Sequence, residues 1–211
     1  MDRRRFLYAA ALVTASSPLL AIAGAPPLAA AGAIDVEAIL NDPATPVAGD
    51  PAGDVTIVAF MDYNCPFCKK SSPDLERFVI DDGKVRLVYK DWPILTDASV
   101  IGARLALAAN YQGKYREAHV AMLNIRGQKV DEASLRAAVK AAGVDMALLD
   151  ADLKAHDADI VALLKRNMSE ADSLGLEATP VFLIGPFKVA KALDYDEFKA
   201  TVADFRARIA K

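Results

Sequence analysis

Both cysteines of the chain, Cys65 and Cys68, lie in one short stretch directly after a continuous run of β-branched and apolar residues. That run, residues 55–61 (VTIVAFM), predicts a strand buried on both faces of a sheet. Pro66, next to the first cysteine, suits the first position of a helix, because that position needs no backbone N–H. Any fold for this chain must therefore place a cysteine pair where a buried strand gives way to a helix.

The rest of the chain predicts an α/β domain with a helical block inside it. Apolar residues recur at helical spacing almost throughout residues 96–174, and β-rich runs on either side indicate strands. In chain order we expect a helical turn near 36–40, strands near 46–48 and at 55–61, a helix from Pro66 to about Ile80, a strand at 84–93, the helical block, two strands from Pro180 to about Leu193, and a helix at 194–210. The net charge of −3 gives no indication of a nucleic-acid partner.

The first 33 residues differ in composition from the rest of the chain. A basic head containing Arg3 and Arg4 leads into an Ala-rich apolar stretch that ends in small residues, the pattern of a cleaved export signal. The sequence RRRFL resembles the twin-arginine export motif, although a Sec signal can also carry arginines. An uncleaved membrane anchor is the alternative, but the apolar run is broken by Pro18 and short for a span. We expect export to the periplasm, where disulfides persist.

A cysteine pair two residues apart can bind a metal, form a structural disulfide or carry redox chemistry. A structural zinc needs four ligands, and the only histidines, His119 and His156, lie far apart in segments expected to be helical. A disulfide across so small a ring contributes about 2 kcal/mol, less than longer loops do. We therefore expect no metal and no other cofactor, and a purely structural bridge is disfavoured.

Redox chemistry fits the expected position of the pair better. At a helix N-terminus, free backbone N–H groups and the helix dipole stabilise a thiolate, so that such cysteines have pKa values of about 3.5 to 7.5. The thiolate is the species that attacks a disulfide. Cys65 is then the nucleophile, and Cys68, one turn inside the helix and less exposed, is the thiol that resolves a mixed disulfide.

Several motifs together resemble one family. CPFC after a buried strand, Pro73 eight residues beyond Cys65, and ATPVFLIG near the C-terminus resemble the thioredoxin fold. The stretches FMDYNCPFCKK, YKDWPIL and NYQGKY are similar to the DsbA-like branch of exported thiol–disulfide oxidoreductases, in its copper-sensitivity-suppressor-like members. The resemblance covers about residues 41–203. It implies an α/β thioredoxin fold, with a central mixed β-sheet flanked by helices and an inserted all-helical domain.

This fold divides the chain into four parts. They are the cleaved, twin-arginine-like export signal (1–33), the first part of the thioredoxin fold with the CPFC motif (34–95), the inserted helical domain (96–174), and the second part of the thioredoxin fold with the Thr-Pro loop (175–211). The resemblance further implies that the Thr179–Pro180 bond is cis and faces the cysteines. Without the cysteine motif, Pro180 would simply begin an edge strand.

The expected site consists of catalytic and substrate-binding residues. Cys65 and Cys68 are catalytic; Thr179, Pro180, Pro66 and Phe67 bind substrate, with Thr179 offering its backbone to an extended segment. Ala59 occupies the position six residues before Cys65 where thioredoxin-like proteins often hold a buried carboxylate. Asp62 is a possible substitute, although a loop cap or a solvated charge is the simpler interpretation. Phe67 replaces the histidine of strongly oxidising members, so we expect a less oxidising pair.

The resemblance implies an enzyme that exchanges disulfides with exported protein substrates through a mixed disulfide at Cys65. We expect a monomeric oxidase that is recharged by a membrane partner linked to quinone. The first alternative is an isomerase or reductase kept reduced by a membrane electron donor, because Thr179 before Pro180 resembles the isomerase-type members. A more distant alternative is a chaperone that binds Cu(I) through the two thiolates.

Overall fold

The computed structural model describes residues 34–127 and 130–210, so the expected export signal lies outside the described residues. The elements follow the predicted order. They are α1 (Val36–Asn41), β1 (Val47–Gly49), β2 (Val55–Met61), α2 (Pro66–Asp82), β3 (Val85–Asp91), α3 (Asp97–Asn110), α4 (Tyr115–Leu123), α5 (Glu132–Ala141), α6 (Met146–Ala155), α7 (Asp157–Ser173), β4 (Val181–Ile184), β5 (Phe187–Val189) and α8 (Tyr195–Ile209).

The five strands form one mixed sheet in the order β1-β3-β2-β4-β5. Strands β2 and β3 are parallel and are connected through α2, whereas the other neighbours are antiparallel. Val58 in the central strand pairs with Val88 of β3 and Leu183 of β4. The continuous apolar composition of residues 55–61 is thus explained by a strand covered on both faces, as predicted.

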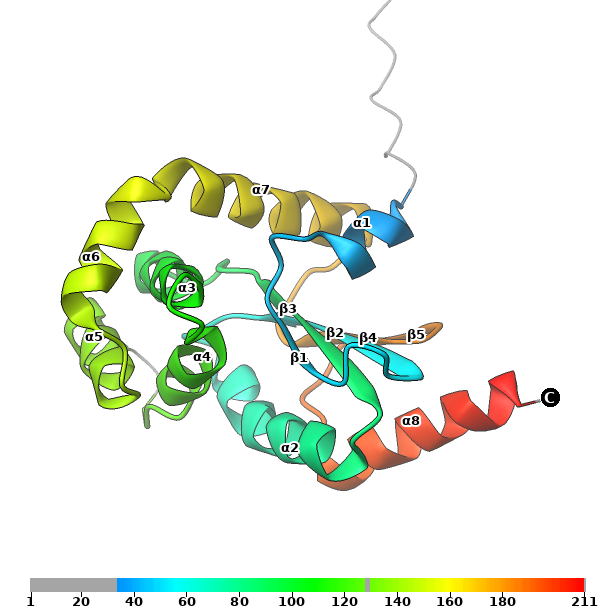
Figure 1. The fold of residues 1–211 in the computed structure, drawn as a ribbon. Helices are drawn as coiled ribbons and strands as arrows, with labels where there is room; N and C mark the ends of the chain where they lie inside the picture. The colour runs from blue at the N-terminus through cyan, green and yellow to red at the C-terminus, as the bar shows by residue number, and fades with distance from the viewer. Residues whose placement is uncertain (1–33, 128–129, 211) are drawn as a thin grey trace, which may run out of the picture. The chain divides into compact units, whose positions relative to one another are not determined.

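Alternate residues of β2 enter two separate cores. Ile57 and Ala59 pack in the core that contains Leu75 of α2 and Phe198 of α8. Val58 and Phe60 pack on the opposite face, in a core with Ile39 of α1, Trp92 and Ala171 of α7. The sheet therefore lies between α1 and α7 on one face and α2 and α8 on the other (Figure 1). Trp92, directly after β3, is 3% exposed in this second core.

Local signals determine where several helices begin and end. Cys65 is the N-cap of α2 and Pro66 its first residue, and Gly83 ends the helix in the left-handed conformation with φ 69°. The Asp131 side chain caps α5 by accepting a hydrogen bond from the Ser134 N–H. At α8, Asp194 and Glu197 form a reciprocal capping box.

Helices α3 to α7 form the predicted block between β3 and β4, on the left of Figure 1. The block is joined to the sheet by a buried ion pair between Lys90 of β3 and Glu170 of α7, with 2.8 Å between Nζ and Oε2. The Asn167 side chain of α7 also donates to the backbone carbonyl of Asp91 at 3.0 Å. The fold is the α/β fold with a helical insertion that the resemblance implied; the residue boundaries of its parts stay a prediction.

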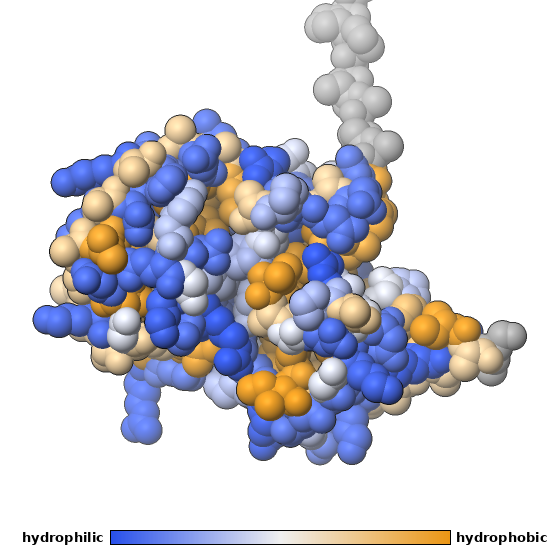
Figure 2. Space-filling view, viewed as in Figure 1, coloured by the Kyte–Doolittle hydropathy of each residue, from blue (hydrophilic) through white to orange (hydrophobic). Residues whose placement is uncertain are grey.

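Most of the exterior visible in Figure 2 is hydrophilic, and the orange apolar areas are small and separate from one another. Within the described ranges 34–127 and 130–210, no helix has both the length and the apolar character needed to cross a membrane.

Candidate active site

Both cysteines lie at the carboxyl end of β2, and both are free thiols. The Cys65 sulfur acts as the N-cap of α2 and accepts a hydrogen bond from the Cys68 N–H at 3.4 Å. Cys65 is 3% exposed and Cys68 is completely buried. Strand β2 and the start of α2 thus place one sulfur at the helix N-terminus and the other one turn inside, as the sequence predicted.

The environment of Cys65 favours its thiolate. A hydrogen bond from the Cys68 side chain, supported by Thr179 and by the backbone N–H groups of Cys68 and Phe67, lowers the pKa of Cys65 to about 6, although partial burial opposes this shift. Much of the Cys65 side chain is therefore ionised at neutral pH. A thiolate at this position is the attacking species that disulfide exchange requires.

Cys68 has the opposite character. Burial, together with the neighbouring Cys65 sulfur, raises the pKa of Cys68 well above its usual value. The backbone N–H of Asp62 donates to Cys68 Sγ at 3.5 Å, which favours the thiolate and partly counters the effect of burial. The two thiols of one motif are thus divided into an ionised thiol at the helix end and a protonated thiol behind it.

The Thr-Pro loop packs directly against the cysteine pair. Cys65 Sγ donates to the backbone carbonyl of Thr179 at 3.2 Å, across 114 residues of sequence. The Thr179–Pro180 bond is cis, as the resemblance implied. Pro180 leads into β4, which lies between β2 and β5, so the alternative of an edge strand at Pro180 is wrong. The Thr179 hydroxyl is buried, and the Thr179 side chain helps to lower the pKa of Cys65.

The two residues between the cysteines are exposed. Pro66 is exposed, and Phe67 is 60% exposed, which places an apolar ring on the surface beside the reactive sulfur. A shallow depression of about 390 Å³ adjoins Pro66, and the basic side chains of Lys69, Lys70 and Arg126 line it. Lys69 Nζ donates to the carbonyl of Gly127 at 3.0 Å across this depression. The exposed rim of the cysteine motif is therefore both apolar and basic.

Asp62 is a site residue whose position the sequence left open. It is completely buried, so the interpretation as a solvated charge is wrong, whereas the interpretation as a loop cap is confirmed by its bond from the Asn64 N–H at 2.7 Å. Asp62 followed by Asn64 at the end of a strand indicates a local turn. Its burial depends on residues 94–99, which are far away in sequence, and no local pattern signals it.

A second buried polar cluster lies behind the motif. The hydroxyl of Tyr63 donates to Asp91 Oδ1 at 2.8 Å and contacts His119 Nδ1 at the same distance, and Tyr115 donates to Asp91 Oδ2 at 3.1 Å. Burial raises the pKa of Asp91 to about 7 and lowers the pKa of His119 to about 3. His119 is thus a structural histidine in a buried network, and its hydrogen-bond partners are Tyr63 and Tyr115, not the cysteines.

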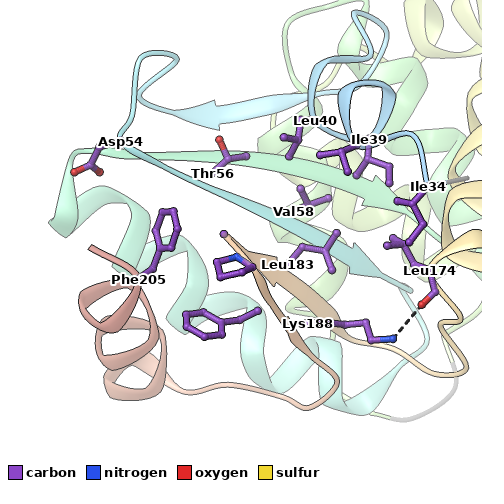
Figure 3. Close-up of a pocket in the computed structure, with 14 residues that line it drawn as sticks. Ile34, Ile39, Leu40, Asp54, Thr56, Val58, Leu174, Leu183, Lys188 and Phe205 are labelled. Carbon is purple, nitrogen blue, oxygen red and sulfur yellow. Dashed lines mark hydrogen bonds between the residues drawn. The ribbon is translucent and has the colours of Figure 1, made fainter. Parts of the chain in front are cut away.

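An apolar pocket lies away from the cysteines. It has a volume of about 460 Å³ and is built on the sheet face that α1 covers, with Val58 of β2 and Leu183 of β4 at its floor (Figure 3). Phe205 of α8 forms one side, and Lys188 closes another by donating to the carbonyl of Leu174 at 3.0 Å. No cysteine lines this pocket, so it is separate from the redox pair.

Within the described part of the chain, no group of three or more His, Cys, Asp or Glu side chains is arranged to hold a metal ion. Reversible thiol chemistry requires only two adjacent sulfurs, which Cys65 and Cys68 provide.

Comparison with known proteins gives a consistent result. Residues 41–204 match a family model described as Thioredoxin. A thioredoxin-like oxidoreductase from Silicibacter pomeroyi is 36% identical, with a TM-score of 0.76, over 82% of this chain and 98% of that one. The thiol-disulfide exchange protein alpha-DsbA2 from Wolbachia pipientis is 28% identical, with a TM-score of 0.74, over 80% and 91%. A periplasmic thioredoxin-like protein from Salmonella enterica serovar Typhimurium is 28% identical, with a TM-score of 0.70, over 81% and 95%.

The curated proteins that match are much longer. Na(+)/H(+) antiporter NhaA 3 from Salinispora tropica is 27% identical over 170 residues, which are 74% of this chain and 25% of the antiporter. This chain thus spans about a quarter of the length of the curated relatives it matches.

Proposed function

This chain belongs to the thioredoxin family, and on that premise we propose that it is a thiol–disulfide oxidoreductase that exchanges disulfides with exported proteins through a mixed disulfide at Cys65. The observation that carries the proposal is the Cys65 sulfur at the N-terminus of α2, with a pKa of about 6. Cys68 stays protonated behind it until the mixed disulfide has formed.

The exchange runs in two steps. In the oxidising direction, a substrate thiolate attacks the Cys65 sulfur of the Cys65–Cys68 disulfide, and Cys68 leaves with the bonding electron pair. A second substrate thiolate then attacks the substrate sulfur of the mixed disulfide and Cys65 leaves as a thiolate. The substrate gains a disulfide while the enzyme gains two thiols. The low pKa of Cys65 makes it a good leaving group in this second step.

Substrate binding is assigned to the surface around Cys65. The backbone of Thr179 lies against the sulfur, and we propose that an extended substrate segment pairs with it while Pro180, which has no N–H, leaves the space beside the sulfurs free of a competing donor. The exposed ring of Phe67 and neighbouring Pro66 offer apolar contact on the other side of the sulfur.

We further propose that the protein works in the periplasm as a monomeric oxidase, recharged by a membrane partner linked to quinone. The periplasmic thioredoxin-like protein from Salmonella supports the compartment. The stabilised Cys65 thiolate supports the direction, because it favours the dithiol form and makes the disulfide a better oxidant. Thr179 before Pro180 favours the second candidate, an isomerase or reductase kept reduced by a membrane electron donor.

Two measurements test these assignments. Cys65→Ser should abolish thiol exchange by the purified protein, and full activity in that variant would refute the central role of Cys65. Alkylation of cell extracts with a mass tag then reports the redox state of the pair in vivo. Predominantly oxidised cysteines support the oxidase, whereas predominantly reduced cysteines support the isomerase or reductase.

A further inference from the structure

Asp62 connects the end of β2 to both cysteines through its backbone. Its carbonyl accepts from the Cys65 N–H at 3.2 Å, and its own N–H donates to Cys68 Sγ at 3.5 Å. Among the residues that the structure describes, no other backbone N–H is hydrogen-bonded to the Cys68 sulfur. The hydrogen bond to the buried Cys68 sulfur therefore depends on the position of the Asp62 N–H.

The side chain of Asp62 determines that position. Four donors converge on its carboxylate: the Asn64 N–H at 2.7 Å, the Ser99 hydroxyl at 2.7 Å, the Ile94 N–H at 2.9 Å and the Leu95 N–H at 3.0 Å. Three of them come from the connection between β3 and α3 and from the first turn of α3. The carboxylate is completely buried, so these bonds are shielded from competition with water.

The same geometry excludes another role for the carboxylate. Both oxygens are occupied by donors, and neither makes a hydrogen bond to Cys68 Sγ. Asp62 therefore does not replace, as a proton acceptor, the carboxylate that is missing at Ala59. Asp62 instead donates a hydrogen bond from its backbone N–H to Cys68 Sγ. Such a bond favours the thiolate form of the sulfur.

We propose that Asp62 is a positioning residue for Cys68, whose carboxylate holds its own backbone N–H against the sulfur that becomes a thiolate during exchange. The proposal rests on the proposed function. When Cys68 resolves a mixed disulfide, its proton passes to the departing substrate thiolate, the Cys65–Cys68 bond forms and the bond to the substrate breaks. In the oxidising direction Cys68 instead leaves as a thiolate. The N–H of Asp62 stabilises that thiolate in both directions.

The two steps can be timed separately with 5,5′-dithiobis(2-nitrobenzoate). Cys65 of the reduced protein attacks the reagent and releases the first thionitrobenzoate, and Cys68 then attacks Cys65 and releases the second. Stopped-flow absorbance at 412 nm resolves both releases. For Asp62→Ala we expect the second release to slow at least tenfold while the first changes by less than about twofold. Cys68→Ser should show only the first release, which identifies the phases.

Two further variants are needed beside Asp62→Ala. One loses a helix cap far from the cysteines, and the other removes a single hydrogen bond to the Asp62 carboxylate. Asp145 caps α6 by accepting from the Ala147 N–H at 2.8 Å and makes no contact with the cysteines, so Asp145→Ala, which removes this cap, should leave both releases unchanged. Ser99→Ala removes one donor and should slow only the second release, by a smaller factor, even if Asp62→Ala does not fold. Equal slowing of both releases, or an unchanged second release in folded Asp62→Ala and Ser99→Ala, would overturn the proposal. Absence of the first release in the wild type would instead refute the proposed function.

Discussion

At the scale of single residues, the chemistry of the site depends on the different surroundings of two identical side chains. Cys65 ends a loop where four groups stabilise its negative charge, and Cys68 lies one helical turn deeper without exposure. The CPFC motif alone places both sulfurs near a helix N-terminus. The hydrogen bonds from the Cys68 and Thr179 side chains to Cys65, together with the burial of Cys68, are what make their pKa values diverge.

The alkylation rate of the reduced protein should therefore follow the ionisation of Cys65. We expect the rate with iodoacetamide to rise with pH through a midpoint near 6 and then to level off, because the thiolate is the reacting form. Mass spectrometry at each pH would locate the modification. Cys65→Ser should remain almost unmodified below pH 8, and a wild-type midpoint near that of a free cysteine, about 8.5, would contradict the assignment.

The reduction potential of the pair should lie between those of thioredoxin and the strongest oxidants, about −270 and −120 mV. A single imidazole next to Cys65 should shift it, because a cationic ring stabilises a thiolate and thereby the dithiol form. We expect Phe67→His to lower the pKa of Cys65 and to make the potential less negative, as measured by equilibration with glutathione. Phe67→Leu serves as the control and should leave the potential unchanged; a wild-type value as high as about −120 mV would contradict the prediction.

At the scale of elements, buried polar contacts join the helical block to the sheet. Asp91 at the end of β3 accepts from Tyr63 in the cysteine loop and from Tyr115 of α4, while Tyr89 of β3 donates to Glu76 of α2 at 2.7 Å. Arg116 of α4 completes a pair with Glu76 at 2.7 Å. Breaking a buried network of this kind leaves polar groups without partners, which costs more than an exposed ion pair contributes.

Asp91 should make stability depend on pH in a specific direction. Burial raises the folded-state pKa of its carboxyl from 3.8 to about 7, so the folded protein holds a proton that the unfolded chain releases between these values. The free energy of unfolding should then decrease as pH rises from 4 to 7 through this group. Asp91→Asn removes that dependence. Between pH 5 and 8 the free energy of unfolding of the wild type should therefore fall by up to about 3 kcal/mol more than that of Asp91→Asn.

Urea unfolding at the two pH values measures this difference. Asp196→Asn makes the same change of charge at an exposed position of α8 and should show no comparable shift. If Asp91→Asn loses stability by an equal amount at pH 5 and pH 8, the carboxyl does not titrate in this range and the assignment is wrong.

At the scale of the whole molecule, a chain with a net charge of −3 presents basic side chains next to its reactive sulfur. Lys70 and Arg126 are exposed, and neither makes an ion pair among the described residues. Local positive potential raises the encounter rate with anions and stabilises an attacking thiolate.

Reversal of the charges of Lys70 and Arg126 should change the relative rates at which the protein reacts with anionic and cationic small disulfides. We expect Lys70→Glu combined with Arg126→Glu to react several-fold more slowly with anionic glutathione disulfide and to lose much less rate, or gain rate, with cationic cystamine. The difference should shrink as salt is added, because exposed charges are screened. Lys140→Glu combined with Lys199→Glu changes the net charge equally at exposed positions outside the depression and should not alter the ratio of the two rates.

Much of this molecule follows from sequence patterns that act over a few residues. The strand at 55–61 and the start of α2, with Cys65 as N-cap and Pro66 behind it, depend on neighbouring residues, so they were predictable and are confirmed. The helix was expected to reach about Ile80, and it continues to Asp82. The breaks inside 96–174 were less well defined, because Ala-rich helical patterns continue across the turn at Gly113, where only a left-handed φ of 66° ends the run.

Side-chain periodicity, proline and helix capping are local properties, and they suffice to bring two cysteines from a buried strand to the start of a helix. Long-range packing was needed to place Thr179 against Cys65, to bury Asp62 beneath residues 94–99, and to join His119 to the network of Asp91. Those outcomes depend on which distant segments cover a residue and remove water from it. Burial and long-range hydrogen bonds set the pKa values of the site, and no pattern within a few residues of Cys65 contains that information.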